Sequence, residues 1–361
     1  MCTGIRLTAK DQTIVYARTL EFAADILSDL IVIPKGYNRV ASTPAIGEKA
    51  PLPGKKWTSQ YASVGMSGLG LPIILDGFNE VGLAIGLFFF PGFAEYMPYN
   101  YFDAENTIAP WEVGSWILEN FETVEQVKTA IKDIVVSKVI FQEFDPTNPP
   151  PVHFVVHDAS GKSIVIEYVG GELHIHDNPL GVITNSPTFD WHITNLRNYV
   201  NFSFTNVPGM ELGSVKLSPL GQGSGMLGMP GDFTPPSRFV RAVAYSQAVS
   251  EAFNKESSKN EYFHAATGEE AILQAFHILN NFDIPKGVAR ESEHKSPKGP
   301  LVPADYTLWI SASDLQAKQY YFRTYENSQI RMVDLNTHKD RSSEITRISI
   351  GEKEIIKIIE P

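Results

Sequence analysis

A single cysteine, placed directly behind the first methionine, is the residue of this 361-residue chain with the strongest potential for nucleophilic chemistry. The chain opens with MCTGIRL, and because Cys2 is small, methionine aminopeptidase is expected to remove Met1. Removal would leave a thiol and a free α-amino group on one residue. An α-amino group has a pKa of about 7.7–8.0, so it can accept the thiol proton near neutral pH without a histidine. The simpler interpretation of Cys2 is a small residue in a loose terminus.

The residues that follow Cys2 predict how partners reach it. Residues 4–8 and 14–18 alternate apolar and polar side chains around the turn AKDQ, which is typical of an antiparallel hairpin. This hairpin would bring Arg18 back beside Cys2, where a cation favours the thiolate. Glu21 follows on the same strand and could hold the amine. Taken alone, Arg18 would be interpreted as half of a strand-end ion pair.

Composition excludes several classes of function. The chain has 30 Lys and Arg against 41 Asp and Glu, a formal charge of −11, and no basic tract for a nucleic acid. One cysteine cannot form a disulfide within the chain, and no apolar run approaches the roughly 20 residues of a membrane span. Residues 1–25 show no basic segment followed by an apolar core, so we expect a cytoplasmic protein, or a periplasmic one if a signal peptide has been trimmed.

Other motifs do not indicate a site. The glycine-rich stretch GQGSGMLGMPGD lacks the Gly-Lys-Ser/Thr ending of a phosphate-binding loop. His153 and His157, like His174 and His176, share a strand face, but no cysteine or carboxylate pattern converges on them, so we expect solvent-facing strand histidines and not a metal site. A papain-like pair would need the cysteine at a helix start.

The expected elements alternate between strands and helices. Period-two and period-three-to-four patterns predict strands over 61–68, 71–75, 81–90, 152–158, 163–169, 172–177, 306–314, 317–327 and 329–335, and helices over 111–136, 235–253 and 267–282. The turn between the second and third of these strands is expected at DGFNE, and 200–235 is expected to be a surface excursion. This order predicts two face-to-face sheets, each covered outside by helices, in a single domain.

Six stretches resemble one known family in order and spacing. They are MCTGIRL, ARTLEF, DGFNEVGLAIGLFFFPGFAEY, GVITNSPTFDWHITNLRNY, GDFTPPSRFVRA and YYFRTYENSQIRMVDL. Together they resemble the choloylglycine hydrolases and penicillin V acylases, which are N-terminal nucleophile hydrolases. The resemblance spans residues 1–361 and implies one α+β domain, a four-layer αββα sandwich with two mostly antiparallel sheets.

The resemblance also assigns roles to individual residues. It implies that Cys2 is both nucleophile and base, that Arg18 is its charge partner, and that Asn185 of TNSP donates its side-chain amide to the oxyanion. Arg238 of PPSRF is implied to belong to a polar network under the thiol. Each has a simpler interpretation when taken singly, Asn185 as a turn residue and Arg238 as a helix-surface charge. Their joint occurrence with an N-terminal cysteine favours the functional interpretation.

Two positions depart from the family pattern. Glu21 stands where the family usually has Asp, so the link from carboxylate to amine could be re-routed. Phe89 stands where Asn or Tyr is common, and a phenyl ring donates no hydrogen bond. Only the Phe89 backbone N–H could therefore join the oxyanion site. Phe22, Phe88, Phe89 and Phe90 suggest an apolar acyl pocket, although alternation along a strand allows two of them to fill the core.

The predicted reaction is hydrolysis of a linear carbon–nitrogen amide through a thioester acyl-enzyme. Candidate small-molecule substrates are conjugated bile salts, phenoxyacetyl penicillin and N-acyl homoserine lactones. The resemblance implies no metal or organic cofactor, and a homotetramer in which residues 200–235 reach a neighbouring copy. Two alternatives remain open: a ligand-binding protein that retains the fold with impaired catalysis, motivated by Glu21 and Phe89, and a cysteine peptidase that depends on one of the nine histidines.

Overall fold

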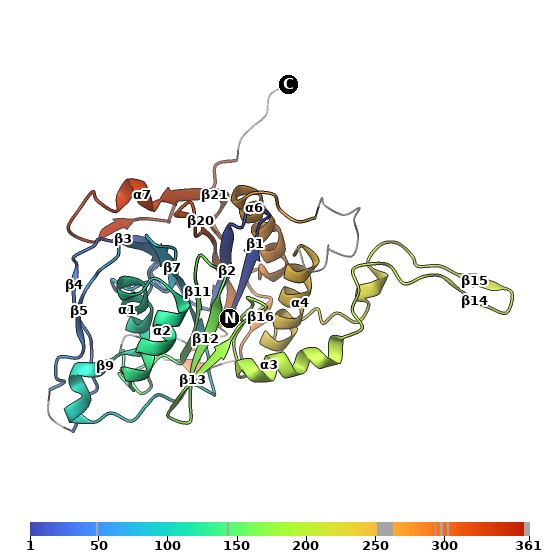
Figure 1. The fold of residues 1–361 in the computed structure, drawn as a ribbon. Helices are drawn as coiled ribbons and strands as arrows, with labels where there is room; N and C mark the ends of the chain where they lie inside the picture. Colours follow the sequence, from blue (N-terminus) through green and yellow to red (C-terminus); the bar gives the residue numbers. More distant parts are fainter. Residues whose placement is uncertain are drawn as a thin grey trace.

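Two antiparallel sheets lie face to face between layers of helix (Figure 1). The structure is a computed structural model, and it describes residues 1–47, 50–142, 144–250, 263–292, 294–296, 299–301 and 303–356. Helices α1 (Val113–Asn120) and α2 (Val124–Ala130) cover one sheet, and α4 (Pro235–Ala248) and α6 (Gly268–Leu279) cover the other (Figure 1). The four-layer sandwich predicted from the sequence is confirmed.

The first sheet carries the chain terminus with Cys2. In the described part of the chain its strand order is β1–β2–β19–β20–β21, with β16 pairing to β19. The strands are β1 (Cys2–Thr8), β2 (Ile14–Phe22), β16 (Ala289–Arg290), β19 (Ala304–Asp314), β20 (Gln319–Thr324) and β21 (Asn327–Asp334). The hairpin β1–β2 is the one that the alternating pattern predicts, and the long strand β19 lies against β2.

The second sheet contributes the opposite wall of the site. Its order among the described residues is β13–β12–β11–β8–β7–β6–β3–β22. The strands are β3 (Leu30–Ile33), β6 (Ser63–Met66), β7 (Asp76–Asn79), β8 (Ala84–Phe89), β11 (Val152–His157), β12 (Ser163–Val169), β13 (Glu172–Asp177) and β22 (Thr346–Ile348).

One predicted turn is wrong. The stretch DGFN, expected to turn, forms strand β7, and the chain turns three residues later. Asn79 causes this shift, because its Oδ1 accepts hydrogen bonds from the N–H groups of Val81 (3.2 Å) and Leu83 (2.9 Å). Gly82 supplies the positive φ of 90° that the turn needs. Asp76 thereby becomes a fully buried strand residue.

The helices begin close to where the sequence predicts. The longer ones are α1 (Val113–Asn120), α2 (Val124–Ala130), α4 (Pro235–Ala248) and α6 (Gly268–Leu279). Thr123 caps α2, since its Oγ1 accepts from the Gln126 N–H. Helix α4 starts at Pro235, the favoured position for proline, and ends at Ala248. Its predicted extension over 251–253 lies outside the described residues.

The remaining elements are short. The strands are β4 (Asn38–Val40), β5 (Lys56–Thr58), β9 (Thr107–Ile108), β10 (Val135–Val136), β14 (Met210–Leu212), β15 (Val215–Leu217), β17 (His294–Ser296) and β18 (Gly299–Leu301). The helical turns are η1 (Tyr101–Asn106), η2 (Pro110–Glu112), η3 (Ile131–Asp133), α3 (Phe189–Asn195), η4 (Leu196–Tyr199), η5 (Ser224–Met226), η6 (Asn280–Phe282) and α7 (Leu335–His338). The predicted surface excursion contains β14 and β15, which form a hairpin that projects from the body of the molecule (Figure 1).

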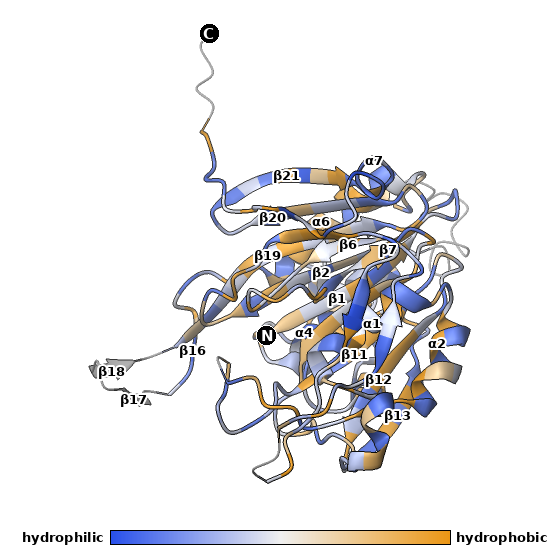
Figure 2. Ribbon diagram, turned by 90° about the vertical axis from the view of Figure 1, so that its left-hand side faces the viewer, coloured by the Kyte–Doolittle hydropathy of each residue, from blue (hydrophilic) through white to orange (hydrophobic). Residues whose placement is uncertain are grey.

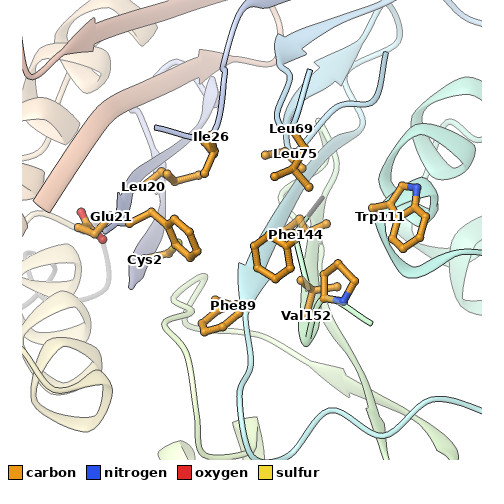
Figure 3. Close-up of a pocket in the computed structure, with 13 residues that line it drawn as sticks. Cys2, Leu20, Glu21, Ile26, Leu69, Leu75, Phe89, Trp111, Phe144 and Val152 are labelled. Atoms are coloured by element: carbon orange, nitrogen blue, oxygen red, sulfur yellow. The ribbon is translucent and has the colours of Figure 1, made fainter. Parts of the chain in front are cut away.

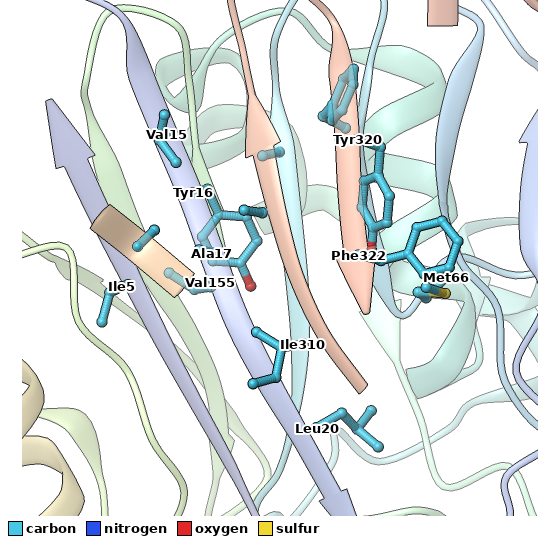
Figure 4. Packing of buried hydrophobic residues seen from close by; sticks show 14 of the residues in the cluster. Ile5, Val15, Tyr16, Ala17, Leu20, Met66, Val155, Ile310, Tyr320 and Phe322 are labelled. Atoms are coloured by element: carbon cyan, nitrogen blue, oxygen red, sulfur yellow. The ribbon is translucent and has the colours of Figure 1, made fainter. Parts of the chain in front are cut away.

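Hydrophobic side chains fill the space between the two sheets. Figure 4 shows this cluster, with Tyr16 and Ile310 of the first sheet facing Met66 and Val155 of the second. In Figure 2 hydrophobic residues run along inner strands such as β19, whereas the outer strand β21 carries more hydrophilic ones. A second cluster packs α1 and α2 on the outer face of the second sheet. Among the described residues, no helix is both long and apolar enough to cross a bilayer.

The histidines of β11 are a second correction. His153 and His157 were expected to face solvent, but they are 1% and 0% exposed. Strand β11 lies inside the second sheet, with Val155 in the core between the sheets and Phe154 and Val156 in the cluster under α1 and α2, so both faces of the strand are covered. His174 and His176 lie on the outer strand β13 and are only partly buried. The described residues contain no group of three or more His, Cys, Asp or Glu side chains arranged to hold a metal.

Candidate active site

Cys2 lies at the first position of β1, on the inside of the sandwich. Its side chain is 4% exposed, and it pairs with Leu20 across the hairpin. Gly4 pairs with Arg18 in the same ladder, so the hairpin returns Arg18 to the neighbourhood of Cys2 as predicted. The thiol is therefore held in a regular strand and not in a loose terminus.

Arg18 is a fully buried cation next to the nucleophile. Its Nη1 donates to the Leu87 carbonyl (2.6 Å), and its guanidinium lies 4.1 Å from the centroid of the Phe88 ring. Its Nη2 has no hydrogen-bond partner among the described residues. Burial alone would lower the pKa of Arg18, but interactions with Cys2 and neighbouring acidic groups raise it above its usual value. The guanidinium is thus charged, and its Nη2 can still donate a hydrogen bond near the thiol.

Asn185 and Arg238 meet under Cys2. Arg238 Nη2 donates to Asn185 Oδ1 (2.7 Å), and its Nη1 donates to the Cys2 carbonyl and to Thr3 Oγ1. The same Asn185 oxygen accepts the Cys2 N–H (2.8 Å), while Asn185 Nδ2 donates to the Phe89 carbonyl (2.7 Å). These contacts bring together four residues singled out from the sequence.

The Phe89 backbone amide faces this network. Phe90 N–H donates to the Pro151 carbonyl (2.8 Å), on the side of β11. Successive residues of a strand direct their N–H and C=O groups to opposite sides. Phe89 therefore directs both groups to the other side, where its carbonyl accepts from Asn185. An N–H and a side-chain amide next to Cys2 are the donors that an oxyanion requires.

Glu21 lies beside Cys2 but bonds elsewhere. Its carboxyl is 1% exposed and Oε1 accepts from Thr307 Oγ1 (3.1 Å), while the Cys2 nitrogen is held by Asn185. Burial raises the pKa of this carboxyl, against the Met1 ammonium and Arg238, which lower it. Oε2 has no hydrogen-bond partner among the described residues. With Met1 in place the Cys2 nitrogen is a peptide N–H that contacts Asn185 and not the Glu21 carboxyl, so the link from this carboxylate to a free amine stays a prediction.

An apolar cavity opens from Cys2 between the two sheets (Figure 3). Its volume is about 590 Å³, including the space at its mouth. The lining residues are Cys2, Leu20, Glu21, Phe22, Ile26, Leu69, Leu75, Leu87, Phe89, Trp111, Phe144, Pro150 and Val152. Apart from Cys2 and Glu21, the lining is aliphatic and aromatic, a composition that suits an uncharged hydrophobic group.

Two of the four phenylalanines expected in the pocket line it. Phe22 and Phe89 meet edge to face with centroids 6.0 Å apart. Phe88 and Phe90 are fully buried and do not line the cavity, because Phe88 packs under Arg18 and Phe90 stacks on His153 at 4.2 Å. Sequence reasoning missed the remaining walls of the cavity, among them Trp111 of η2 and Phe144 of the loop before β11. No periodic pattern marks such residues.

Buried histidines hold the loop that carries Asn185. His153 bridges Glu167 (Nδ1 to Oε1, 3.0 Å) and the Thr184 carbonyl (Nε2, 3.2 Å), and His192 Nε2 lies 2.9 Å from the Asn185 carbonyl. Burial lowers the pKa of His192 to about 4, so it is neutral near pH 7. Although burial opposes it, hydrogen bonding from His153 lowers the pKa of Glu167 to about 2. This network fixes the backbone on either side of the Asn185 amide.

Comparison with known proteins shows that the chain is similar in sequence to one family of hydrolases over most of its length. The family model described as linear amide C–N hydrolases, choloylglycine hydrolase family, matches residues 2–347. The chain is 34% identical over 347 residues to the bile salt hydrolase/transferase of Clostridium perfringens, covering 96% of this chain and 95% of that protein. It is 27% identical over 335 residues to the penicillin V acylase of Pectobacterium atrosepticum, covering 89% of this chain and 77% of that protein.

Solved structures show the same fold. A Cys-to-Ala mutant of the conjugated bile acid hydrolase from Clostridium perfringens superposes with a TM-score of 0.80 at 31% identity, covering 100% of both chains. The penicillin V acylase from Agrobacterium tumefaciens gives a TM-score of 0.71 at 23% identity, covering 97% of this chain and 92% of that one, which shows the fold alone. These similarities confirm the resemblance on which the sequence interpretation rests.

Proposed function

The chain belongs to the choloylglycine hydrolase family of linear amide C–N hydrolases, and from this premise we propose that Cys2, freed of Met1, cleaves amides with an apolar acyl group. The observation that carries the proposal is the position of Cys2. It lies between the donor network of Asn185 and Arg238 and an apolar cavity that adjoins the thiol. A nucleophile, oxyanion donors and an acyl pocket are the parts that acyl transfer requires.

The proposed reaction has two halves. The free α-amine of Cys2 takes the thiol proton, Sγ attacks the substrate carbonyl carbon, and the Phe89 N–H and Asn185 Nδ2 stabilise the negative oxygen of the tetrahedral intermediate. The intermediate collapses, the C–N bond breaks, and the leaving amine takes the proton from the Cys2 amine. Water, activated by the same amine, then attacks the thioester and releases the acid. Arg18 stabilises the thiolate before attack.

The composition of the cavity favours one class among the candidate substrates. Its wall offers few polar side chains, and burying a hydroxyl without a hydrogen bond costs roughly 1–3 kcal/mol. A phenoxyacetyl or plain alkanoyl group therefore fits better than a hydroxylated steroid acyl group. We infer a preference for phenoxyacetyl amides, such as phenoxyacetyl penicillin, and for N-acyl homoserine lactones over conjugated bile salts.

Labelling of the thiol separates an enzyme from a binding protein. Because the chain has one cysteine, iodoacetamide reports on Cys2 alone. An active site predicts alkylation at pH 7 that is faster than for a model thiol and that depends on a free α-amine, checked by intact mass for the absence of Met1. Labelling as slow as for a model thiol, together with binding but no hydrolysis of a phenoxyacetyl amide, would favour the fold-retaining binding protein.

Replacing the sulfur tests the nucleophile itself. Cys2→Ser keeps the N-terminal amine and the pocket, but a hydroxyl is hardly ionised near neutral pH. We expect hydrolysis of phenoxyacetyl penicillin to fall by orders of magnitude while the substrate still binds. Hydrolysis by the serine variant at the parent rate would show that sulfur is not the nucleophile. Full activity in a preparation that wholly retains Met1 would contradict the amine as base.

We also propose that the protein is a homotetramer in which the excursion over 200–235 contacts a neighbouring copy. The hairpin β14–β15 supports this proposal. Every residue from Met210 to Leu217 is exposed, and four of the eight are large apolar residues: Met210, Leu212, Val215 and Leu217. Apolar side chains on both strands of a projecting hairpin are typical of a segment that packs against a partner.

A further inference from the structure

A second cavity adjoins the apolar cavity that opens from Cys2. Its volume is about 700 Å³, including the space at its mouth. Polar side chains contribute to its lining, namely Arg39, Ser42, Glu112 and Ser115. We call it the polar cavity. Among the described residues, Trp111 is the one side chain that lines both cavities, so its ring stands between them.

Two segments of the chain line both cavities and show that the layer between them is thin. The two leucines at the ends of segment 69–75 line the apolar cavity, whereas its middle, 71–73, lines the polar one. In the loop before β11, Phe144 lines the apolar cavity and Phe141 lines the polar cavity. The two cavities therefore lie on either side of single side chains.

Trp111 is held firmly in this position. It is 6% exposed, and its ring packs against Phe141 with centroids 5.6 Å apart. The next residue fixes the turn η2: the Glu112 carboxylate accepts the Ala109 N–H (3.0 Å), and it also accepts the N–H (3.0 Å) and the hydroxyl (3.1 Å) of Ser42. Because both the backbone and the ring of Trp111 are packed, the indole forms a fixed boundary of the apolar cavity.

We propose that Trp111 determines the longest acyl group that the site accepts, because its ring closes the apolar cavity against the polar one. This inference rests on the function proposed above, in which the acyl group bonded to Cys2 enters the apolar cavity. In Figure 3 Trp111 lies on the far side of Phe144 from Cys2. An extended acyl chain therefore meets the indole ring with its far end.

The polar cavity behind the ring also affects which chain ends are accepted. Ser115 Oγ accepts the Ile74 N–H (3.1 Å), so its own hydrogen can be donated to a ligand. At the end of the apolar cavity, a terminal hydroxyl of the acyl chain would instead be buried among aliphatic and aromatic side chains, which is unfavourable. Without the indole ring, a longer chain would carry its end into the polar cavity.

A series of N-acyl homoserine lactones from butanoyl to tetradecanoyl tests the role of Trp111. In the parent protein, shown by intact mass to lack Met1, kcat/KM should rise about fourfold for each methylene group that the cavity buries. The rise should stop at the chain length that reaches the ring. Trp111→Ala should raise kcat/KM by about tenfold or more for the chain that exceeds this limit by two methylene groups. Butanoyl, which ends near the thiol, should be hydrolysed much as by the parent.

Two further variants separate the length limit from a general loss of packing. Trp111→Phe keeps an aromatic ring against Phe141 and should move the limit less than Trp111→Ala does; it decides if the alanine variant fails to fold. The control is Trp57→Ala, the same change at a tryptophan that lines the polar cavity but not the apolar one, and it should leave the parent limit unchanged. A terminal hydroxyl on the longest accepted chain should lower kcat/KM severalfold less in Trp111→Ala than in the parent.

The outcomes distinguish this inference from the function on which it rests. Length profiles of the Trp111 variants that coincide with that of the parent would overturn the inference and leave the proposed function intact. A limit that Trp57→Ala moves as far as Trp111→Ala does would overturn it too, as would a parent without a limit. Hydrolysis of phenoxyacetyl penicillin but of no lactone by the mature parent would overturn the inference alone. Hydrolysis of neither substrate would overturn the proposed function as well.

Discussion

Asn185 is the residue through which the parts of the site are connected. One side-chain amide accepts from the Cys2 nitrogen and from Arg238, and donates to the Phe89 carbonyl. Nδ2 carries a second hydrogen that the Phe89 bond does not use. The side chain can therefore position the amine of the nucleophile and stabilise the oxyanion in the same reaction.

Replacing Asn185 by Ala tests this double role. Turnover of a phenoxyacetyl amide should fall by roughly a hundredfold or more, the usual effect of removing one oxyanion donor. Alkylation of Cys2 by iodoacetamide should slow far less, because that reaction forms no oxyanion. Asn198→Ala, at an exposed position in η4, is the control and should change neither rate. Equal losses in turnover and alkylation would assign Asn185 to the support of the thiol alone.

His157 makes the free energy of unfolding sensitive to acid. It is fully buried against Tyr16 (ring centroids 4.7 Å apart), both ring nitrogens lack hydrogen-bond partners among the described residues, and burial lowers its pKa far below the usual value. Below about pH 6.5 His157 binds a proton in the unfolded chain but not in the folded chain. The free energy of unfolding therefore falls as the pH drops through this range.

We expect His157→Phe to remove this pH dependence. Between pH 8 and pH 5 the variant should lose about 2 kcal/mol less of its free energy of unfolding than the parent, the value for one histidine with an unfolded pKa near 6.5. Urea unfolding at the two pH values measures the difference. His277→Phe, at an exposed position on α6, should behave as the parent does. Parallel losses for parent and His157→Phe would mean that folded His157 takes up the proton.

Sequence reasoning at this scale identified the polar residues better than the apolar ones. Cys2 and Arg18 were predicted from their functional groups and positions, whereas Asn185 and Arg238 were assigned by the family resemblance, and the structure places the four in contact or in electrostatic range. A phenylalanine side chain has no functional group that marks it as part of a site. Their chemistry is the same in a pocket and in a core, and only the three-dimensional packing separates Phe89 from its two buried neighbours.

At the scale of elements, strand β7 explains why one turn was misplaced. Asp-Gly was interpreted as a turn because both residues favour one. Asp76 instead enters the space between the sheets, where its Oδ2 accepts from Ser311 of β19 (2.7 Å) and Tyr320 of β20 (2.6 Å). It also interacts electrostatically with Arg18. The hairpin and the helices could be predicted from local patterns. The buried position of Asp76 could not, because it depends on hydrogen bonds to Ser311 and Tyr320 of the other sheet.

Removing the Tyr320 hydroxyl tests this link between the sheets. Tyr320→Phe keeps the ring against Phe78 but leaves the buried Asp76 with one hydrogen bond fewer, which should lower the free energy of unfolding by about 1–3 kcal/mol. Tyr321→Phe is the matched control on the opposite face of β20, because its hydroxyl donates to half-buried Gln319 and, among the described residues, to no buried carboxylate. Urea unfolding of both variants checks the difference, and equal effects would contradict a special role for the Asp76 contact.

The order of layers in the whole molecule followed from the order of elements in the sequence. Strands that are apolar along their whole length need cover on both faces, and the helices that follow them supply it. The excursion over 200–235 was predicted as a surface segment, but not its hairpin, because strands of three residues are too short to show a period. An isolated hairpin is marginally stable in water, so β14–β15 needs a further contact to persist.

Shortening this hairpin tests the proposed assembly. Asn206 Nδ2 donates to the Gly221 carbonyl (2.8 Å) and Asn206 Oδ1 accepts the Gly223 N–H (2.8 Å), so the base of the hairpin is closed without its tip. Replacing residues 208–219 by two glycines should therefore preserve the fold of each chain. We expect light scattering to give a tetramer for the parent and a smaller species for the shortened chain, with melting temperatures within a few degrees when both are measured as dilute, dissociated chains. Cys2 alkylation serves as the check that the site survives. The proposed interface would be wrong if the parent had a monomeric mass, or if the shortened chain still formed the parent assembly. Dissociation of the shortened chain with normal alkylation of Cys2 would show that the projecting strands hold the copies together through their apolar side chains.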